Sequence, residues 1–309
     1  MPPRPLDHLP DGIVISLLER IAPGSRLTRV ELLPGSFSNH THLVEARLPD
    51  GNMLKCAVRR YQVFGDYGRD EKARREYKAF ELMNRCGIPS PEPLLLDDSG
   101  SILDVAGIVT RFVEGELRLE NPSDPLDWAR KMAVMLARIH SIPLSEADRS
   151  FLLEANSLAT WFLRAEAAPK YMQDFPGGVE VWKTTRDLYP SLKPVPPVLV
   201  HVDYWSGNIL WQEGEIVAVL DWEEAAYGDA GTDVAYARMN MVLMGIPEAA
   251  EEFLQVYEAR SGQKVENLGL WELAASVRPM VDPLDWELDK GGHRERLQGF
   301  IAAALKRAK

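Results

Sequence analysis

The sequence predicts an α+β protein with a small β-rich lobe that holds one helix, followed by a larger, mainly helical lobe. Short apolar runs separated by turn residues fill the first 115 residues, whereas helical patterns dominate from residue 116. The charge changes at the same place. Residues 1–115 hold 15 basic and 16 acidic residues, and residues 116–309 hold 20 and 30. We therefore expect two domains, 1–115 and 116–309.

The first lobe reads as strands around one helix. The expected strands cover residues 27–33, 41–48, 53–60, 94–97 and 108–113, which are rich in β-branched and apolar residues. Asp50 and Gly51 lie between two of these runs and are typical of a hairpin turn. A helix is predicted over 69–85, because Gly87 and Pro89 directly follow it and act as stop signals.

The second lobe carries apolar residues three and four positions apart, the spacing that predicts helices. The expected helices cover residues 126–140, 157–167, 179–188, 232–243, 247–261, 268–277 and 293–309. One β segment interrupts them, with strands expected at 198–201, 209–211 and 216–220.

Composition excludes several classes of protein. The net charge is −11 and the isoelectric point is near 5.2, which argues against a nucleic-acid or anionic-membrane partner. The two cysteines, Cys56 and Cys86, indicate no disulfide framework. The N-terminus lacks the apolar core of a signal peptide, and no apolar run approaches the ~18 residues of a membrane span. We therefore expect a cytoplasmic protein.

Residues 198–224 carry the residues that point to a chemistry. A strand ends at His201, a loop holds Asp203 and Asn208, and a hairpin leads to Asp221. Because opposed residues in a hairpin lie about 5 Å apart, we expect Asp203, Asn208 and Asp221 to converge at one end of it. A carboxylate for a hydroxyl proton, with amide and carboxylate oxygens for Mg²⁺, is what phosphoryl transfer needs. Ordinary turn chemistry is the alternative explanation of this segment.

The pattern also resembles a known family. The aminoglycoside phosphotransferase and choline kinase-like superfamily of small-molecule kinases shows a similar series, which here reads His201-x-Asp203-x-x-x-x-Asn208, Asp221-Trp-Glu and Tyr227-Gly-Asp-Ala-Gly-Thr-Asp233. The resemblance implies a protein kinase-like, two-lobed fold that uses ATP and magnesium. It extends from the strands of the first lobe to about residue 242.

The same resemblance implies roles for individual residues. Asp203 would be the catalytic base, Asn208 and Asp221 would bind magnesium, and His201 and Asp233 would be structural supports. One position departs from the family pattern. Position 202, where the family usually has glycine, is valine in this chain.

The first lobe offers a candidate phosphate-binding loop between its first two strands. Ser36, Phe37, Ser38 and Asn39 lie there and resemble the family's glycine-poor phosphate loop, in which small and polar residues let backbone N–H groups approach phosphates. In isolation, the same residues are more typical of an ordinary hairpin than of a phosphate loop.

A kinase also needs a strand cation and a helix carboxylate that orients it. Strand alternation places Lys55 and Arg59 on one face, and Arg59 occupies the position of the protein-kinase lysine, with Lys55 as the second candidate. Helical periodicity places Glu76 within the apolar arc of the predicted helix. We therefore expect an Arg59–Glu76 ion pair that binds the nucleotide. A solvated strand end and a solvated helix edge are the alternatives.

Together these features predict an ATP- and Mg²⁺-dependent phosphotransferase that moves the γ-phosphoryl group to a hydroxyl of a small molecule. The alternative is a catalytically silent nucleotide-binding protein, which Arg59 in place of lysine and Val202 in place of glycine motivate. An antibiotic-modifying and a metabolic role both stay open. The acidic second lobe is compatible with a cationic acceptor, and Trp205, Glu223 and Glu224 are candidates for the wall of its site.

Overall fold

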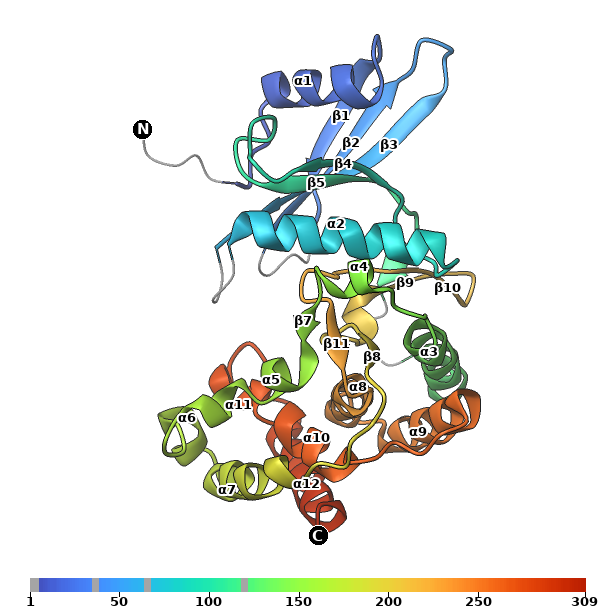
Figure 1. Cartoon of the computed structure of the whole chain (residues 1–309). Coiled ribbons are helices and arrows are strands. Elements are labelled where there is room, and N and C mark those ends of the chain that lie inside the picture. The colour runs from blue at the N-terminus through green and yellow to red at the C-terminus, as the bar shows by residue number, and fades with distance from the viewer. Residues whose placement is uncertain (1–5, 35–38, 64–67, 118–121) are drawn as a thin grey trace. The chain divides into compact units, whose positions relative to one another are not determined.

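The computed structural model describes residues 6–34, 39–63, 68–117 and 122–309 (Figure 1). The chain divides into two compact units. The smaller unit comprises Met1–Gly115 and Val217–Glu224, and the larger unit comprises Glu116–Ile216 and Ala225–Lys309. Residues 217–224 therefore belong to the smaller unit, although they lie in the second half of the chain and include the end of strand β10 (Glu215–Val219).

The smaller unit is built on a five-stranded antiparallel sheet with the order β1-β2-β3-β5-β4 (Figure 1). Its strands are β1 (Arg26–Leu32), β2 (Asn39–Arg47), β3 (Met53–Tyr61), β4 (Pro93–Asp97) and β5 (Gly107–Arg111). All five lie where the apolar runs predicted them. Arg59 sits in the central strand, paired with Thr41 of β2 and with Ile108 of β5. This pairing fixes the backbone from which its side chain projects.

Two helices accompany the sheet, α1 (Asp11–Ile21) and α2 (Arg69–Arg85). The bounds of α2 are those that the sequence predicted, but the prediction of a single helix in this lobe was wrong. Helix α1 buries Ile13, Val14, Leu17 and Leu18, whose spacing places them on one helical face against the sheet. That spacing was visible in the sequence, and packing on the strands stabilises the helix.

The larger unit is mainly helical. Its helices are α3 (Pro125–His140), α4 (Glu146–Arg149), α5 (Ala155–Ala159), η1 (Trp161–Arg164), α6 (Lys170–Gln173), α7 (Gly178–Leu188), η2 (Tyr189–Ser191), η3 (Ser206–Asn208), α8 (Gly231–Leu243), α9 (Pro247–Ser261), α10 (Leu268–Ala275), α11 (Arg278–Val281) and α12 (His293–Arg307). None of the helices in the described part of the chain combines the length and the apolar character that a membrane span requires.

Two predicted helices of this unit are broken. The helix expected over 157–167 is divided into α5 and η1 at Thr160, whose hydroxyl donates to the carbonyl oxygen of Asn156 at 2.7 Å. A threonine that bonds to the backbone in this way weakens a helix. The helix expected over 268–277 likewise ends with α10 at Ala275, and α11 begins at Arg278.

Six short strands lie outside the five-stranded sheet in the described part of the chain. They are β6 (Glu116–Leu117), β7 (Leu153–Glu154), β8 (Val198–Val200), β9 (Ile209–Gln212), β10 (Glu215–Val219) and β11 (Ala226–Gly228). Strand β11, which the sequence did not predict, lies between β7 and β8 in one three-stranded sheet. This sheet supports the chain where it leaves β8 at Val200.

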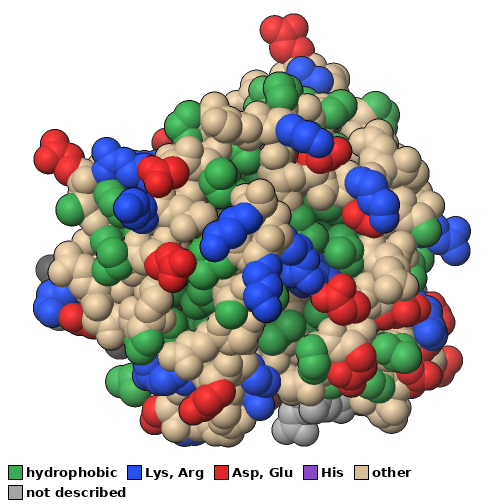
Figure 2. All heavy atoms as spheres, turned by 90° about the horizontal axis from the view of Figure 1, so that it is seen from below, with side chains coloured by type: hydrophobic (Ala, Val, Ile, Leu, Met, Phe, Trp, Pro, Cys, Tyr) green, Lys and Arg blue, Asp and Glu red, His purple; other side chains and the backbone are tan. Residues whose placement is uncertain are grey.

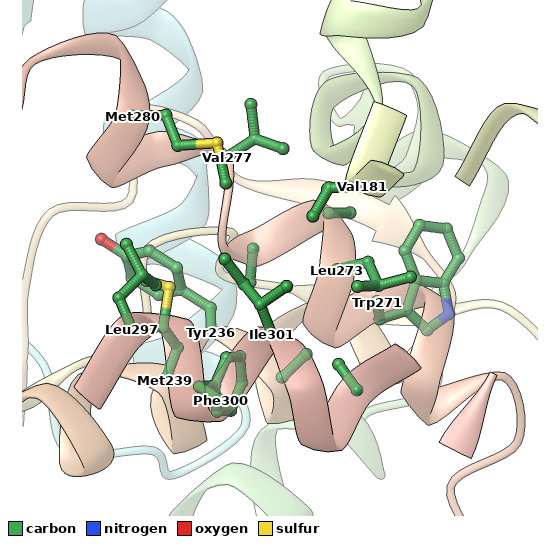
Figure 3. Close-up of a cluster of buried hydrophobic side chains, with 14 of the residues drawn as sticks. Val181, Tyr236, Met239, Trp271, Leu273, Val277, Met280, Leu297, Phe300 and Ile301 are labelled. Atoms are coloured by element: carbon green, nitrogen blue, oxygen red, sulfur yellow. The ribbon is translucent and has the colours of Figure 1, made fainter. Parts of the chain in front are cut away.

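The core of the larger unit surrounds α8 (Figure 3). The side chains drawn there come from α7, α8, the α10–α11 segment and α12, and they include Val181, Tyr236, Met239, Trp271, Leu273, Val277, Met280, Leu297, Phe300 and Ile301. Nearly every residue of α8 is buried, as expected for a central helix. The first turn of α8 carries Asp233, so this core also fixes a residue of the candidate site.

Candidate active site

Asp233 holds the loop that follows β8. Its Oδ2 atom accepts from the backbone N–H of His201 at 2.7 Å, and its Oδ1 atom accepts from the backbone N–H of Val202 at 2.7 Å. The Asp233 side chain is fully buried. Two successive backbone N–H groups thus donate charge-assisted hydrogen bonds to one carboxylate. These bonds fix the direction in which the chain enters the loop.

Val202 adopts a left-handed conformation, with a φ of +74°. This region favours glycine, because a Cβ atom crowds the backbone there. The Val202 side chain packs in a small apolar cluster with Ala155, Val200 and Ala226. Two contacts therefore stabilise valine at a position where the family has glycine. The backbone N–H of Val202 donates to Asp233, and the Val202 side chain packs in the apolar cluster.

A buried polar chain extends behind Asp233. The Nε2 atom of His140 lies 3.1 Å from Asp233 Oδ2, and its Nδ1 atom lies 2.7 Å from the Tyr257 hydroxyl. Burial raises the pKa of Tyr257 above its ordinary value, so that hydroxyl stays neutral. His140 thus supports the carboxylate that holds the loop.

Asp203 lies on this loop with its carboxylate partly exposed, at 28% of the side chain. Its Oδ2 atom accepts from the Nδ2 amide of Asn208 at 2.8 Å, and its backbone N–H donates to His201 Nδ1 at 3.3 Å. Asn208 also donates to the backbone carbonyl of Asp203 at 2.9 Å. The structure therefore brings Asp203 and Asn208 together, and both bonds use the amide nitrogen of Asn208 rather than its oxygen.

The second oxygen of Asp203 has a partner that sequence reasoning missed. Arg278 Nη1 lies 3.1 Å from Asp203 Oδ1, and Arg278 Nη2 donates to the backbone carbonyl of Val202 at 3.3 Å. The guanidinium also lies over the ring of Tyr236, 4.5 Å from its centroid. Arg278 is 75 positions away from Asp203 in the chain and belongs to no recognisable motif, so nothing in the sequence pointed to it.

In the smaller unit, Arg59 joins three carboxylates. Its Nη1 atom lies 3.3 Å from Glu76 Oε1, and its Nη2 atom lies 2.6 Å from Asp221 Oδ1 and 3.5 Å from Glu223 Oε2. Lys55, the other strand cation, is partly exposed and pairs with Glu114 at 2.6 Å. The predicted ion pair between Arg59 and Glu76 is therefore present.

Glu76 is fully buried and fully bonded. Its Oε2 atom accepts from the Tyr61 hydroxyl, and its Oε1 atom accepts from the backbone N–H of Trp222 at 3.2 Å. Burial raises the pKa of Glu76 to about 7; Arg59 opposes this rise, and the neighbouring carboxylates of Asp221 and Glu223 add to it. Glu76 thereby fixes both Arg59 and the chain next to Asp221.

Burial by itself would lower the pKa of Arg59, but the carboxylates of Asp221 and Glu76 raise it well above the ordinary value. The guanidinium therefore stays charged within this group. A single guanidinium pairs with three carboxylates, so it cannot balance their negative charge alone. A second cation near Glu223 would reduce the remaining charge.

Glu223 has such a second cation. Lys72 Nζ lies 3.2 Å from Glu223 Oε1, and Asn39 Nδ2 donates to Glu223 Oε2 at 2.7 Å. The expectation that Glu223 lines an acceptor site was wrong, because its side chain is buried among these partners of the smaller unit. Sequence reasoning missed Lys72, although it lies four residues before Glu76 on α2 and hence on the same helical face.

Asn39 is the one residue of the predicted phosphate-binding loop whose contacts the structure describes. Its side chain is buried, and its Oδ1 atom accepts from the backbone N–H of Gln62 at 3.2 Å. Ser36, Phe37 and Ser38 lie outside the described residues.

The predicted magnesium ligands are an amide and a carboxylate. Within residues 6–34, 39–63, 68–117 and 122–309, no group of three or more His, Cys, Asp or Glu side chains is arranged to hold a metal ion. Magnesium in nucleotide sites is typically held by one or two protein oxygens together with phosphates and waters. The side-chain oxygens of Asn208 and Asp221 are of that kind, so the donor set fits this ion.

Three comparisons place the chain among known proteins. The model of the phosphotransferase enzyme family matches residues 30–271. The 4-hydroxytryptamine kinase of Psilocybe cubensis is 26% identical over 259 residues, which are 73% of this chain and 71% of that protein. Acyl-CoA dehydrogenase family member 11 of Gallus gallus is 28% identical over 182 residues, 54% of this chain. The chain spans about a fifth of that relative's length, 22%.

A solved structure supports the fold. The crystal structure of a spectinomycin phosphotransferase in complex with ADP and spectinomycin has a TM-score of 0.61 and 14% identity to this chain. The likeness covers 95% of this chain and 93% of that one. It confirms the predicted mixed fold, with a β-rich N-terminal part and a helical C-terminal part.

Proposed function

The chain belongs to the phosphotransferase enzyme family, and on this premise we propose that it transfers the γ-phosphoryl group of ATP, with Mg²⁺, to a hydroxyl of a small molecule. The observation that carries the proposal is the environment of Asp203. A partly exposed carboxylate lies on a loop that Asp233 fixes, and the amide of Asn208 orients it at 2.8 Å. A residue that receives a proton in phosphoryl transfer needs this combination of access and orientation.

We assign the proton transfer to Asp203. The acceptor oxygen forms a bond to the γ-phosphorus, the bond from that phosphorus to the leaving oxygen of ADP breaks, and the hydroxyl proton passes to the Asp203 carboxylate and then to solvent. Asn208 keeps the carboxylate oriented through its amide nitrogen. Asn208 and Asp221 would hold Mg²⁺, which when bound neutralises charge on the nucleotide phosphates.

The smaller unit would bind the nucleotide. Arg59 would contact the phosphates, and Glu76 would orient it, as their ion pair supports. The backbone of residues 36–38 with Asn39 would cover the phosphates. Arginine keeps the charge of the usual lysine but presents it as a planar fork with several donors.

A catalytically silent nucleotide-binding protein is the second candidate. The ion pair between Arg59 Nη2 and Asp221 Oδ1, at 2.6 Å, favours it, because it places a cation on a proposed magnesium ligand.

One experiment separates the two functions. Transfer of labelled phosphate from Mg-ATP is measured across amino alcohols, sugars, hydroxy acids and aminoglycosides, and nucleotide binding is measured by calorimetry. We expect Asp203→Asn to lower turnover by about 10²- to 10⁴-fold, the contribution of a positioned general base. Asp174→Asn, which removes an exposed ion pair with Lys170 in the same unit, is the matched control and should leave turnover unchanged. Equal rates for wild type and Asp203→Asn, with nucleotide still bound, would support the silent protein.

A further inference from the structure

Arg59 reaches two carboxylates with the same nitrogen atom. Its Nη2 atom lies 2.6 Å from Asp221 Oδ1 and 3.5 Å from Glu223 Oε2. Its Nη1 atom lies 3.3 Å from Glu76 Oε1. All of these residues belong to the smaller unit. The guanidinium can therefore keep its bond to Glu76 while Nη2 moves between the other two carboxylates.

Glu76 provides a fixed pivot for such a movement. Its carboxylate is fully buried, and it accepts from the Tyr61 hydroxyl and from the backbone N–H of Trp222. The guanidinium carbon of Arg59 also lies over the ring of Tyr61, 5.5 Å from its centroid. Because these contacts hold the Nη1 side of the guanidinium, a change of partner is confined to the Nη2 side.

Glu223 is held where it can receive the guanidinium. Lys72 Nζ lies 3.2 Å from Glu223 Oε1, and Asn39 Nδ2 donates to Oε2 at 2.7 Å. Arg75 Nη1 donates to the backbone carbonyl of Glu223 at 2.7 Å. A carboxylate oxygen accepts more than one hydrogen bond, so Oε2 can accept from Arg59 while it keeps Asn39.

Asp221 is the more accessible of the two alternative partners. Its side chain is 28% exposed, against 11% for Glu223. It is also a proposed magnesium ligand, and Mg²⁺ binds carboxylate oxygens directly and at short range. A metal ion on Asp221 would bring a second positive charge next to the guanidinium, and like charges repel. Arg59 and the metal therefore compete for Asp221.

The acidity of the whole chain does not explain how a cation would be directed to this carboxylate. On the face that Figure 2 shows, acidic and basic side chains are interspersed. Among the described residues, the carboxylates near Asp221 are paired with the side chains of Arg59 and Lys72. The affinity of Asp221 for a metal is therefore set by this local pairing.

We propose that Arg59 is a two-position gate on the metal ligand Asp221. Without nucleotide, Nη2 holds Asp221 and excludes the metal. When the nucleotide phosphates attract the guanidinium, Nη2 moves to them and to Glu223, and Asp221 is released. Metal and nucleotide then bind cooperatively through Arg59, and each raises the affinity for the other by the same factor.

This gate explains why arginine stands where kinases usually have lysine. Its two Nη atoms can hold Glu76 and exchange the second partner at the same time, whereas an ammonium group is a single point charge. The gate rests on the proposed function and regulates the same site. It also gives the Arg59–Asp221 ion pair, which favours a silent protein, a role in an active one.

The first measurement is the binding of ATP by calorimetry, with a chelator to remove metal. Asp221→Asn removes the carboxylate from which the phosphates must draw Arg59, so we expect about 10-fold tighter binding than for wild type. Loss of a negative charge by itself also favours an anion. In an Arg59→Gln background, where only that general effect is left, Asp221→Asn should gain much less. Asp98→Asn, which changes an exposed carboxylate of the same unit, is the control.

The second measurement is the binding of Mg²⁺ and Mn²⁺ without nucleotide, by calorimetry and by the electron paramagnetic resonance of Mn²⁺. Arg59→Gln should bind metal about 10- to 100-fold more tightly than wild type, the range for a charge-assisted bond. Arg59→Lys should lie between them. Arg111→Gln removes an exposed arginine–glutamate pair of the same unit and should behave as wild type. Circular dichroism and thermal unfolding establish that each variant is folded, and Arg59→Lys replaces Arg59→Gln in both measurements if the latter does not fold.

Metal affinities that are the same in wild type and in the folded Arg59 variant, or no metal binding by either, would overturn the gate. An Asp221→Asn gain that is equal in both backgrounds would overturn it too. Phosphate transfer that depends on Asp203 would then leave the proposed function standing. Conversely, the expected changes in metal and nucleotide affinity, with no transfer to any acceptor and with ATP turnover that Asp203→Asn does not change, would overturn the proposed function and leave the gate standing.

Discussion

The backbone N–H of Val202 donates to the Oδ1 atom of Asp233 at 2.7 Å, although Val202 has a φ of +74°. The left-handed conformation costs an L-residue about 1–2 kcal/mol. Since the other oxygen of Asp233 accepts from the backbone N–H of His201, one buried carboxylate stabilises the strained conformation of Val202, the residue directly before Asp203. The loop that carries the proposed base therefore depends on Asp233.

The first prediction concerns that carboxylate. In Asp233→Asn the amide nitrogen would face one of the two backbone N–H groups, and a buried N–H left without an acceptor costs about 1–3 kcal/mol. We expect the free energy of unfolding of the larger unit to fall by about 2 kcal/mol or more, measured by urea titration. The exposed Asp174→Asn variant is the control. An unchanged unfolding midpoint would show that Asp233 does not hold the loop.

The second prediction isolates the strain at Val202. Val202→Ala and Val202→Gly both lose the apolar contacts with Ala155, Val200 and Ala226, so their difference reports the backbone conformation. We expect the glycine variant to be more stable than the alanine variant by about 1 kcal/mol, despite the greater chain entropy of glycine. Thermal unfolding of the two variants measures this difference. An alanine variant as stable as the glycine variant, or more stable, would show that the backbone of Val202 is not strained.

Much of the local structure could be predicted from the sequence. The bounds of α2 followed from its periodicity and from Gly87 and Pro89, and the inward position of Glu76 followed from the same periodicity. Sequence periodicity did not predict the helices correctly where tertiary packing or a side-chain hydrogen bond determines the structure. The pattern of α1 was present but needed the sheet to become a helix, and Thr160 divides a segment whose apolar spacing predicts a continuous helix.

In the candidate site, contacts between residues near in the sequence could be predicted, whereas contacts between distant residues could not. Arg59 and Glu76 lie 17 positions apart on consecutive elements, so their pairing could be predicted. Lys72 and Glu223 are 151 positions apart, and Arg278 and Asp203 are 75 apart. No periodicity or motif connects residues at such separations, because the tertiary fold alone brings them together.

The third prediction concerns the single guanidinium among Glu76, Asp221 and Glu223. Arg59→Met removes the cation and leaves buried carboxylates without it, which costs about 3–5 kcal/mol. Arg59→Lys keeps the charge but lacks the fork that reaches several partners, so we expect an intermediate loss. Urea unfolding measures both variants, with the exposed Arg29→Lys as a control. A lysine variant no better than methionine would show that charge is not what Arg59 contributes.

The fourth prediction follows from the pKa of Glu76, which burial raises from an ordinary value of 4.5 to about 7. Between these two values the folded protein binds more protons at this site than the unfolded chain does. Stability must therefore fall as the pH rises through that window, and it must level off above pH 7. The size of the shift corresponds to about 3 kcal/mol.

Thermal unfolding between pH 5 and pH 8 provides the measurement. Wild type should lose stability across this range, and Glu76→Gln should lose much less, because its amide does not titrate. Glu81→Gln changes an exposed carboxyl on the same helix and should keep the wild-type slope. If Glu76→Gln and wild type show the same slope, then Glu76 is charged throughout, and the Arg59 ion pair outweighs burial at this carboxylate.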